Sequence, residues 1–338
     1  SGKLHIYGGL KHFQLAGDIF VKDGRFNVDF LKTAYHFTDT IKVRKEEIRF
    51  DNIKLYDSEN NWGALTGRLS HKHFKDMRYR FDIKCNNVLA MNTTSKDNED
   101  FYGKAYGTGN VRVTGNYSQV NFNINMKTEP NTKVVIPMVT SAIATENSFI
   151  QFISKPSIIN SNTTYKTNQS AINAPTSGKT NIHVYLQLEA TPDAEIKLIT
   201  DPVGGDMVRA EGSGDLKIDY TNTGDIKLYG NYEVEKGDYI FTLQQVVRKN
   251  FAIKRGGTIR WAGNPYEAII DLNATYTVPS VSLLDILDET ELEGVSRTST
   301  PVNCLLNLTG DLMQPTIKFD LELPSDPELQ RKIKYVVN

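Results

Sequence analysis

Apolar and polar residues alternate along most of this chain, in short runs separated by turn residues. The clearest run lies near the C-terminal end, where every second residue is apolar, at Ile317, Phe319, Leu321 and Leu323. A period of two residues is typical of a β-strand with one apolar face. The pattern therefore predicts a sheet whose apolar side has to be covered.

Similar strands are expected over most of the sequence, because turn signals recur between the alternating runs. Asp23-Gly24 is a strong hairpin signal, and Gly-Gly, Asn-Thr-Gly and Lys-Gly-Asp turns separate later runs. Strands joined by such short turns pair as antiparallel neighbours in a meander. No helix with a matching apolar face alternates with them, so the cover is either another part of the sheet, curled over, or a ligand.

The chain also contains an internal repeat with a shift of 105 positions, which indicates two copies of a multi-strand unit stacked end to end. The shift places Tyr79, Phe81 and Ile83 on Val184, Leu186 and Leu188, and it places Gly107-Thr108-Gly109 on Gly212-Ser213-Gly214. Throughout this alignment, positions expected to face inward in one copy fall on positions expected to face inward in the other, and outward positions likewise. The Gly-x-Gly element is not expected to bind a nucleotide, because an alternating strand follows it instead of a helix.

Apolar positions on the alternating strands are the candidate lining of the covered face. These positions are Tyr79, Phe81, Ile83, Val111, Val113, Val184, Leu186, Leu188, Ile196, Leu198, Leu216, Ile218, Ile226, Leu228, Ile317, Phe319, Leu321 and Leu323.

Four segments follow from these patterns. Residues 1–156 are expected to form a first β segment that ends near a short apolar helix around 147–153. Residues 157–178 are rich in Ser, Thr and Asn and predict a long flexible loop. Residues 179–324 form the second β segment, interrupted by a short helix at 281–287. Residues 325–338 predict a C-terminal helix, with Asp326 as its N-cap and Pro327 at its first position.

Composition supports an elongated β protein. Apolar residues make up 39% of the 338 residues, while Tyr (16) and Phe (15) are common, as is usual for strands. The 39 basic and 40 acidic residues are mixed along the chain and give a net charge of −1, which argues against a nucleic-acid partner.

Two cysteines, Cys85 and Cys304, match no metal or redox spacing. A disulfide between them is one alternative, and two buried free thiols are the favoured one. The sequence contains no apolar run long enough for a membrane helix and no signal peptide. Because it begins abruptly in front of a strand, we expect a fragment of a longer protein.

Enzymatic chemistry is not indicated. His71 and His73 form a His-x-His pair, but no third metal ligand lies nearby, so we expect solvated turn histidines and no metal. There is no nucleophile elbow and no carboxylate pair in an apolar setting. We expect a protein that is not an enzyme and needs no cofactor.

The stretch from Arg255 to Pro324 carries a family resemblance. Its motifs are Arg255-Gly256-Gly257-Thr258-Ile259, Gly263-Asn264-Pro265-Tyr266-Glu267-Ala268, Asp271-Leu272-Asn273-Ala274-Thr275-Tyr276, Leu308-Thr309-Gly310-Asp311-Leu312, and the run from Pro315 to Pro324. They resemble the C-terminal region of the TamB family, the inner-membrane component of the translocation and assembly module. The specific match spans roughly residues 195–338.

The resemblance implies a taco-shaped β groove of the kind that bridge-like lipid transfer proteins have. The candidate lining residues would then hold phospholipid acyl chains. It also implies a periplasmic location in a Gram-negative bacterium, an N-terminal inner-membrane anchor on the full-length protein, and an Omp85-type outer-membrane barrel such as TamA as partner. The stretch from Arg255 to Pro324 would form the mouth of this groove rather than a packed core.

Two other functions remain open at this point. One is a chaperone or scaffold for outer-membrane β-barrel proteins, which would use open strand edges to pair with its clients. The other is a secreted β-solenoid or adhesin whose apolar face is simply a packed core.

Overall fold

The computed structural model describes residues 1–9, 14–138, 180–201, 204–223, 226–243, 247–282 and 299–324. They form one 18-stranded sheet. The first nine strands are β1 (Gly2–Tyr7), β2 (Gln14–Val28), β3 (Thr33–Arg44), β4 (Glu47–Asp57), β5 (Trp62–Lys72), β6 (Lys75–Thr93), β7 (Tyr102–Asn116), β8 (Gln119–Thr128) and β9 (Lys133–Pro137). The others are β10 (Asn181–Ala190), β11 (Glu195–Asp201), β12 (Asp206–Thr221), β13 (Ile226–Leu243), β14 (Val247–Ile253), β15 (Gly257–Gly263), β16 (Ile269–Ser282), β17 (Ser299–Asp311) and β18 (Thr316–Glu322).

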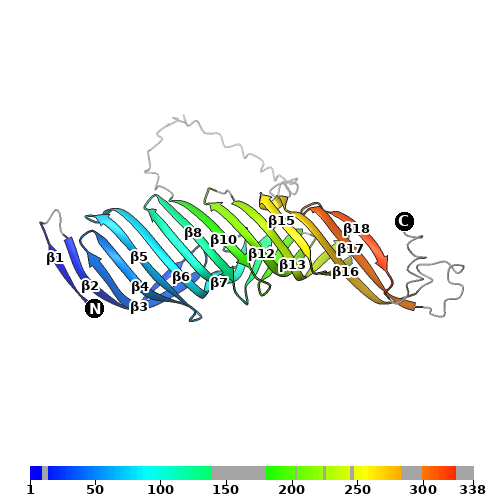
Figure 1. Ribbon diagram of the computed structural model, residues 1–338, viewed down its shortest axis with the longest axis horizontal. Coiled ribbons are helices and arrows are strands. Elements are labelled where there is room, and N and C mark those ends of the chain that lie inside the picture. The colour runs from blue at the N-terminus through cyan, green and yellow to red at the C-terminus, as the bar shows by residue number, and fades with distance from the viewer. Residues whose placement is uncertain are drawn as a thin grey trace, which may run out of the picture.

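The strands lie side by side at a common slant along an elongated body, with β1 at one end and β18 at the other (Figure 1). This confirms the prediction of an all-β, elongated sheet. Within the described part of the chain, the one helical element is a 3-10 turn, η1 (Pro265–Glu267). No helix in that part is long and apolar enough to cross a membrane.

The expected helices and loop lie largely outside the described residues. This applies to the apolar helix around 147–153, the loop at 157–178 and the C-terminal helix at 325–338. The helix expected at 281–287 is wrong at its start, because Val281 and Ser282 belong to β16 and pair with Thr300 and Ser299. Residues 283–287 are not described.

Consecutive strands pair antiparallel, as predicted, except for β14 and β15, which both pair with β13 and β16, and except where the two repeat copies meet. There β8 runs parallel to β10, with Ile124 beside Leu186, and β9 runs parallel to β11, with Val134 beside Ile196. A parallel pair needs a long connection, and residues 138–180 separate β9 from β10. Short turn signals inside each copy could not indicate this junction.

Two breaks in the strands face each other at the junction. Both β8 and β9 pair with β7, so together they act as one strand that is interrupted at 129–132. In the same way, β10 and β11 both pair with β12 and act as one strand that is interrupted at 191–194. The interruptions are bonded together, because the Thr191 amide donates to Thr128 Oγ1 (2.8 Å) and the Glu195 amide donates to the Thr132 carbonyl (2.9 Å). The six strands β7 to β12 are therefore paired in a closed ring around the two interruptions.

The repeated Gly-x-Gly element serves close packing between strands. A Cβ atom on Gly109 would lie 2.1 Å from the Asn125 carbonyl oxygen, and one on Gly214 would lie 2.3 Å from the Asn231 oxygen. Separations this short are not tolerated between a side chain and backbone. The glycines occupy equivalent places in the two copies, on β7 and β12, which explains why the repeat retains them.

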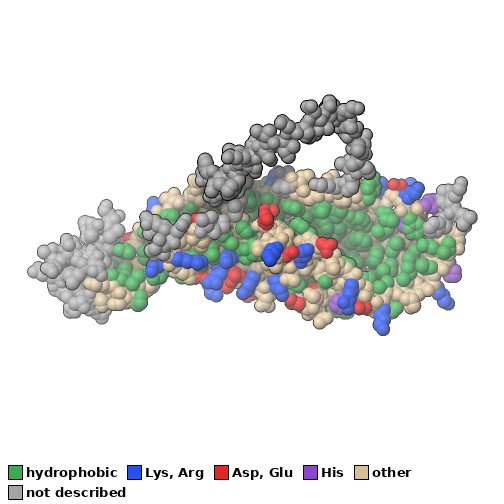
Figure 2. All heavy atoms as spheres, turned by 180° about the vertical axis from the view of Figure 1, so that it is seen from behind, with side chains coloured by type: hydrophobic (Ala, Val, Ile, Leu, Met, Phe, Trp, Pro, Cys, Tyr) green, Lys and Arg blue, Asp and Glu red, His purple; other side chains and the backbone are tan. Residues whose placement is uncertain are grey.

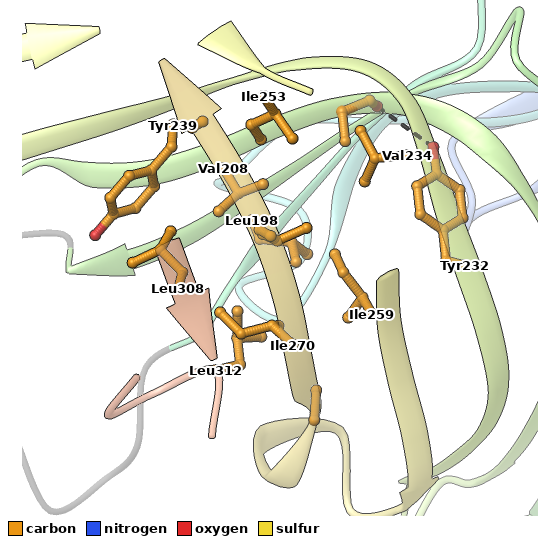
Figure 3. Packing of buried hydrophobic residues seen from close by; sticks show 14 of the residues in the cluster. Leu198, Val208, Tyr232, Val234, Tyr239, Ile253, Ile259, Ile270, Leu308 and Leu312 are labelled. Atoms are coloured by element: carbon orange, nitrogen blue, oxygen red, sulfur yellow. Dashed lines mark hydrogen bonds between the residues drawn. The ribbon is translucent and has the colours of Figure 1, made fainter. Parts of the chain in front are cut away.

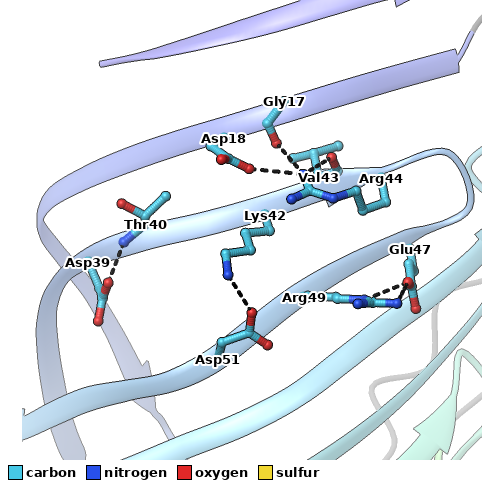
Figure 4. A network of polar contacts seen from close by, with 10 residues as sticks. All are labelled: Gly17, Asp18, Asp39, Thr40, Lys42, Val43, Arg44, Glu47, Arg49 and Asp51. Atoms are coloured by element: carbon cyan, nitrogen blue, oxygen red, sulfur yellow. Dashed lines mark hydrogen bonds and ion pairs between the residues drawn. The ribbon is translucent and has the colours of Figure 1, made fainter.

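One side of the sheet is polar and carries ion pairs between neighbouring strands. Arg44 on β3 pairs with Asp18 on β2 (2.9 Å) and Lys42 on β3 pairs with Asp51 on β4 (2.9 Å), while Arg49 and Glu47 pair within β4 (Figure 4). Exposed pairs of this kind contribute about 0.2–1 kcal/mol each. Their main effect is to keep this side of the sheet hydrated. The apolar residues lie on the opposite side.

Asp57 joins the β4–β5 turn to β6. Its side chain is 1% exposed, and Oδ1 accepts hydrogen bonds from the amides of Glu59 (2.8 Å) and Asn61 (2.9 Å). Oδ2 accepts from the Leu89 amide (2.7 Å) and from the Asn61 side chain (3.0 Å). A single carboxylate thus satisfies the buried Leu89 amide and the two partly buried amides of the turn.

Replacing Asp57 by Ala should destabilise the protein by roughly 3 kcal/mol, because it leaves one buried and two partly buried backbone N–H donors without their acceptor. Urea denaturation measures this as a lower midpoint. The control is Asp51→Ala, which removes only an exposed ion pair and should shift the free energy of unfolding by less than about 1 kcal/mol. Equal effects of the two substitutions would contradict the anchoring role of Asp57.

Candidate functional site

The apolar residues form continuous rows across neighbouring strands. Residues that are directly paired point to the same side of a sheet. One row passes through seven strands, from β5 to β13, as Leu65, Ile83, Val111, Ile124, Leu186, Ile218 and Leu228. We call the side of the sheet that carries this row the inner face.

The inner face extends to both ends of the sheet. Towards the N-terminal end, Leu69 pairs with Ile48, Ile48 with Val43, and Val43 with Gly17, which pairs with Leu4 on β1. Towards the C-terminal end, Tyr232 pairs with Ile259, Ile259 with Ile270, and the next row joins Leu272, Leu308 and Ile317 on β18. The whole sheet therefore shares one apolar side.

Every candidate lining residue that lies in a strand falls on the inner face. The partly buried ones are Tyr79, Phe81, Ile83, Val111, Val113, Val184, Leu186, Leu188, Ile196, Ile218, Leu228 and Leu321. Leu198 and Leu216 are buried, whereas Ile226, Ile317 and Phe319 are exposed. Leu323 follows β18 and is buried. The structure thus brings the set onto one surface, and their role in binding a ligand stays a prediction.

Burial divides the inner face into two parts. We call the part carried by β11 to β17 the closed half, because its residues pack on one another (Figure 3). Val234 and Leu272 are 0% exposed there, and Tyr232 is 1% exposed. Burial raises the pKa of the Tyr232 hydroxyl, which bonds to the Ala210 carbonyl (3.5 Å).

The sheet curls in this region until distant strands touch. Phe241 on β13 and Phe319 on β18 have ring centroids 6.2 Å apart, although β14, β15, β16 and β17 come between these strands in the chain. The stretch from Arg255 to Pro324 supplies Ile259, Leu272 and Leu308 to the packed core. The expectation of an open mouth is therefore wrong for these three residues, which protein covers, whereas Ile317 and Phe319 on β18 of the same stretch are exposed.

The remaining part of the inner face, carried by β1 to β8 and the adjoining end of β10, is only partly covered, and we call it the open half. Leu4, Ile6 and Phe26 lie on it and are 44%, 73% and 40% exposed. Figure 2 shows hydrophobic side chains gathered in a long hollow on this side of the molecule. Contiguous exposed apolar surface of this kind marks a binding site for an apolar ligand or partner.

Several strands of the open half, β4 and β6 among them, are deeply buried at one end and more accessible at the other. Ile53, Leu55 and Val88 are 1%, 5% and 6% exposed. They lie far from the turns at residues 44–47, 70–76 and 116–118, which follow one another along the accessible edge of the sheet. We call this edge the rim. The open half is therefore a trough with a buried bottom and an accessible rim.

The candidate set missed the N-terminal strands and β8. Their inner-face apolar residues are Leu4, Ile6, Leu15, Ile19, Ile41, Ile48, Leu65, Leu69, Val120, Phe122 and Ile124. The same alternation of apolar and polar positions is visible in their sequences, most clearly at Val120, Phe122 and Ile124. Extending the parity argument from β6 and β7 to their neighbours would have found them.

Both cysteines are free and lie on the inner face, Cys85 opposite Gly63 and Cys304 opposite Tyr276. Burial raises the pKa of the Cys85 thiol to about 11, and it also raises the pKa of Cys304. This agrees with the favoured interpretation of two free thiols.

The interpretation of His71 as a solvated histidine is wrong, whereas His73 is exposed as expected. His71 is 4% exposed, and its ring stacks on Phe74 with centroids 4.4 Å apart. It continues the inner-face alternation of Leu65 and Leu69 on β5, which the polar sequence of the turn obscured. Among the described residues, no cluster of three His, Cys, Asp or Glu side chains could hold a metal.

Comparison with known families gives one match. The family described as the TamB C-terminal domain matches residues 49–333, which is most of the chain. A search of curated proteins finds no matching relative.

The two halves should respond differently to a buried charge. Leu272→Asp places a carboxylate in the closed half and should cost roughly 3–5 kcal/mol of folding free energy, because the charge has neither water nor a partner. Leu186→Asp lies on a partly accessible part of the inner face and should cost about 1 kcal/mol. Urea midpoints of the two variants measure the difference. Equal losses would show that the whole inner face is a packed core.

The Cys85 thiol should be protected from alkylation. With a pKa of about 11, only about 1% of the thiol is ionised at pH 9, compared with about half or more of an unperturbed cysteine. In a Cys304→Ser variant, iodoacetamide should therefore react with the folded protein at least tenfold more slowly than with the protein unfolded in urea. Matching rates in the two states would contradict the burial of Cys85.

Proposed function

Because this chain belongs to the TamB family, we propose that the open half of its inner face holds phospholipid acyl chains and lets them pass along the trough. The observation that carries the proposal is the contrast between the two halves. The same apolar side of one sheet is covered by protein in the closed half and left accessible in the open half. An apolar ligand is the natural cover for the accessible part.

The hydrophobic effect is large enough for this role. Each methylene removed from water contributes about 0.8 kcal/mol, so a sixteen-carbon chain contributes on the order of 10 kcal/mol. Rows of Leu, Ile, Val and Phe offer no directional contacts, so no single position should hold a chain in place. Such a surface suits movement along the trough, and it requires no enzymatic step.

The setting follows from the same family. We infer that the protein works in the periplasm of a Gram-negative bacterium, with an inner-membrane anchor on the full-length protein and an Omp85-type barrel such as TamA as partner. In this setting the trough would shield acyl chains on their way between the inner and outer membranes.

A second candidate function is supported by the N-terminal end of the sheet. Within the described residues, β1 pairs only with β2, so its other edge has no partner strand. All six residues of β1 are exposed. Such edges can accept a strand from another chain, which is the requirement for a scaffold that assists outer-membrane β-barrel proteins.

The lipid proposal predicts that phospholipid is bound to the purified chain and detected by native mass spectrometry. Leu186→Asp should lower the bound lipid, and lipid transfer between donor and acceptor vesicles, at least fivefold. The matched control is Gln187→Asp, which adds the same charge to the next residue on the opposite face.

Two results would contradict the proposal. One is a folded wild-type protein that binds no phospholipid, with its apolar trough instead occupied by a client β-strand. The other is equal loss of transfer in the Leu186 and Gln187 variants, since a general charge effect would then explain both.

A further inference from the structure

A polar cavity of about 850 Å³ lies at the rim of the open half. Three successive turns line it: residues 44–47 between β3 and β4, residues 70–72 and 76–78 between β5 and β6, and residues 116–118 between β7 and β8. Because these strands are neighbours in the sheet, the turns stand side by side above the apolar trough.

The cavity contains cations that are not committed to other groups. Of its basic residues, Arg44 is paired with Asp18 outside the cavity. Lys45, Lys72 and Arg78 form no ion pair with any part of the chain that the structure describes. The acidic residues at the cavity are Glu46, Glu47 and Asp76, and Glu47 is paired with Arg49. Glu46 and Asp76 form no ion pair with described residues either, so three uncommitted cations face two uncommitted carboxylates, and the small positive excess favours an anion.

His71 supplies an independent reason to expect an anion. Its Nδ1 accepts a hydrogen bond from the Phe74 amide (3.2 Å), so in the neutral ring the proton resides on Nε2. Nε2 is buried and has no hydrogen-bond partner among the described residues. A buried donor without an acceptor is costly, and a turn of the ring towards the adjoining cavity would let an anionic oxygen there satisfy it.

The apolar trough begins directly beneath these groups. Leu69 and Tyr79 are paired on the inner face, and the cavity residues His71 and Met77 lie two positions further along β5 and β6 on that same face. Tyr79 stacks on Phe81, one step deeper along β6 (5.8 Å between centroids). A molecule with an anionic group in the cavity could therefore lay an apolar tail along the trough without crossing polar surface.

We propose that the rim cavity binds the phosphate of a phospholipid headgroup, with His71 Nε2, Lys72 and Arg78 as donors, while the acyl chains lie on the open half. This inference rests on the proposed function. It adds a fixed polar site to an otherwise non-directional surface. The rim cavity would then select phosphate-bearing lipids over uncharged ones and set the place where a lipid enters or leaves the trough.

The test uses three probes: dihexanoyl phosphatidylglycerol below its micelle concentration, dihexanoyl glycerol, which has the same acyl chains without phosphate, and inorganic phosphate. Titration calorimetry measures the affinity of each for the 338-residue chain. The double variant Lys72→Gln/Arg78→Gln removes two cavity cations. Its matched control, Lys217→Gln/Lys227→Gln, removes two exposed lysines of β12 and β13 that lie away from the cavity.

The expected result is a loss of at least fivefold in phosphatidylglycerol affinity for the cavity variant, with no change for dihexanoyl glycerol and no change in the control. Nitrogen NMR of the His71 ring should also show a shift of Nε2 when phosphatidylglycerol binds, because this atom gains an acceptor.

Other results would overturn the inference in distinguishable ways. If phosphatidylglycerol and dihexanoyl glycerol both bind but the cavity variant weakens neither, the rim site is wrong and the lipid-binding trough stands. If inorganic phosphate binds as tightly as phosphatidylglycerol, the cavity takes free phosphate rather than a lipid headgroup. If neither acyl-bearing probe binds the wild-type chain, the proposed function fails as well.

Discussion

The need to cover an apolar sheet face governs the whole structure. A strand with alternating residues has an apolar side that water does not solvate well, and this chain supplies no helical layer to cover it in the described residues. In the closed half the sheet satisfies the requirement by curling until Phe241 meets Phe319. In the open half the curl leaves the trough accessible along the rim. The difference between a packed core and a binding surface is thus a difference in curvature along one continuous sheet.

The parity of the strands could be predicted from the sequence, and the curvature could not. Alternation at Val184, Leu186 and Leu188 is a local property, so it placed these residues on the correct side of the sheet. Whether Leu272 is buried by protein depends on how far strands separated by many residues approach each other, which no local pattern records. For this reason the local pattern could not show that the residues around Leu272 form part of a packed core instead of an open mouth.

Two further features depended on information beyond the local sequence. The parallel pairing of β8 with β10 follows a long connection, so turn signals gave no indication of it. His71 lies in a polar turn and resembled a solvated residue, yet the turn folds Phe74 over its ring. In both cases a contact across the fold overrides the preference of the local sequence. The polar rim site was missed for the same reason, since its three turns are neighbours only in space.

The parallel junction between the two repeat copies also orders the events of folding. Within each copy, strands meet neighbours that are close in the chain, so their hairpins can form early and independently. The β8–β10 ladder brings Val120 beside Ile182 and requires closure of a loop of about sixty residues. Contacts of such sequence separation form slowly. We therefore expect the junction to close after the hairpins of each copy, and until it closes each copy has an unpaired edge that another chain can reach.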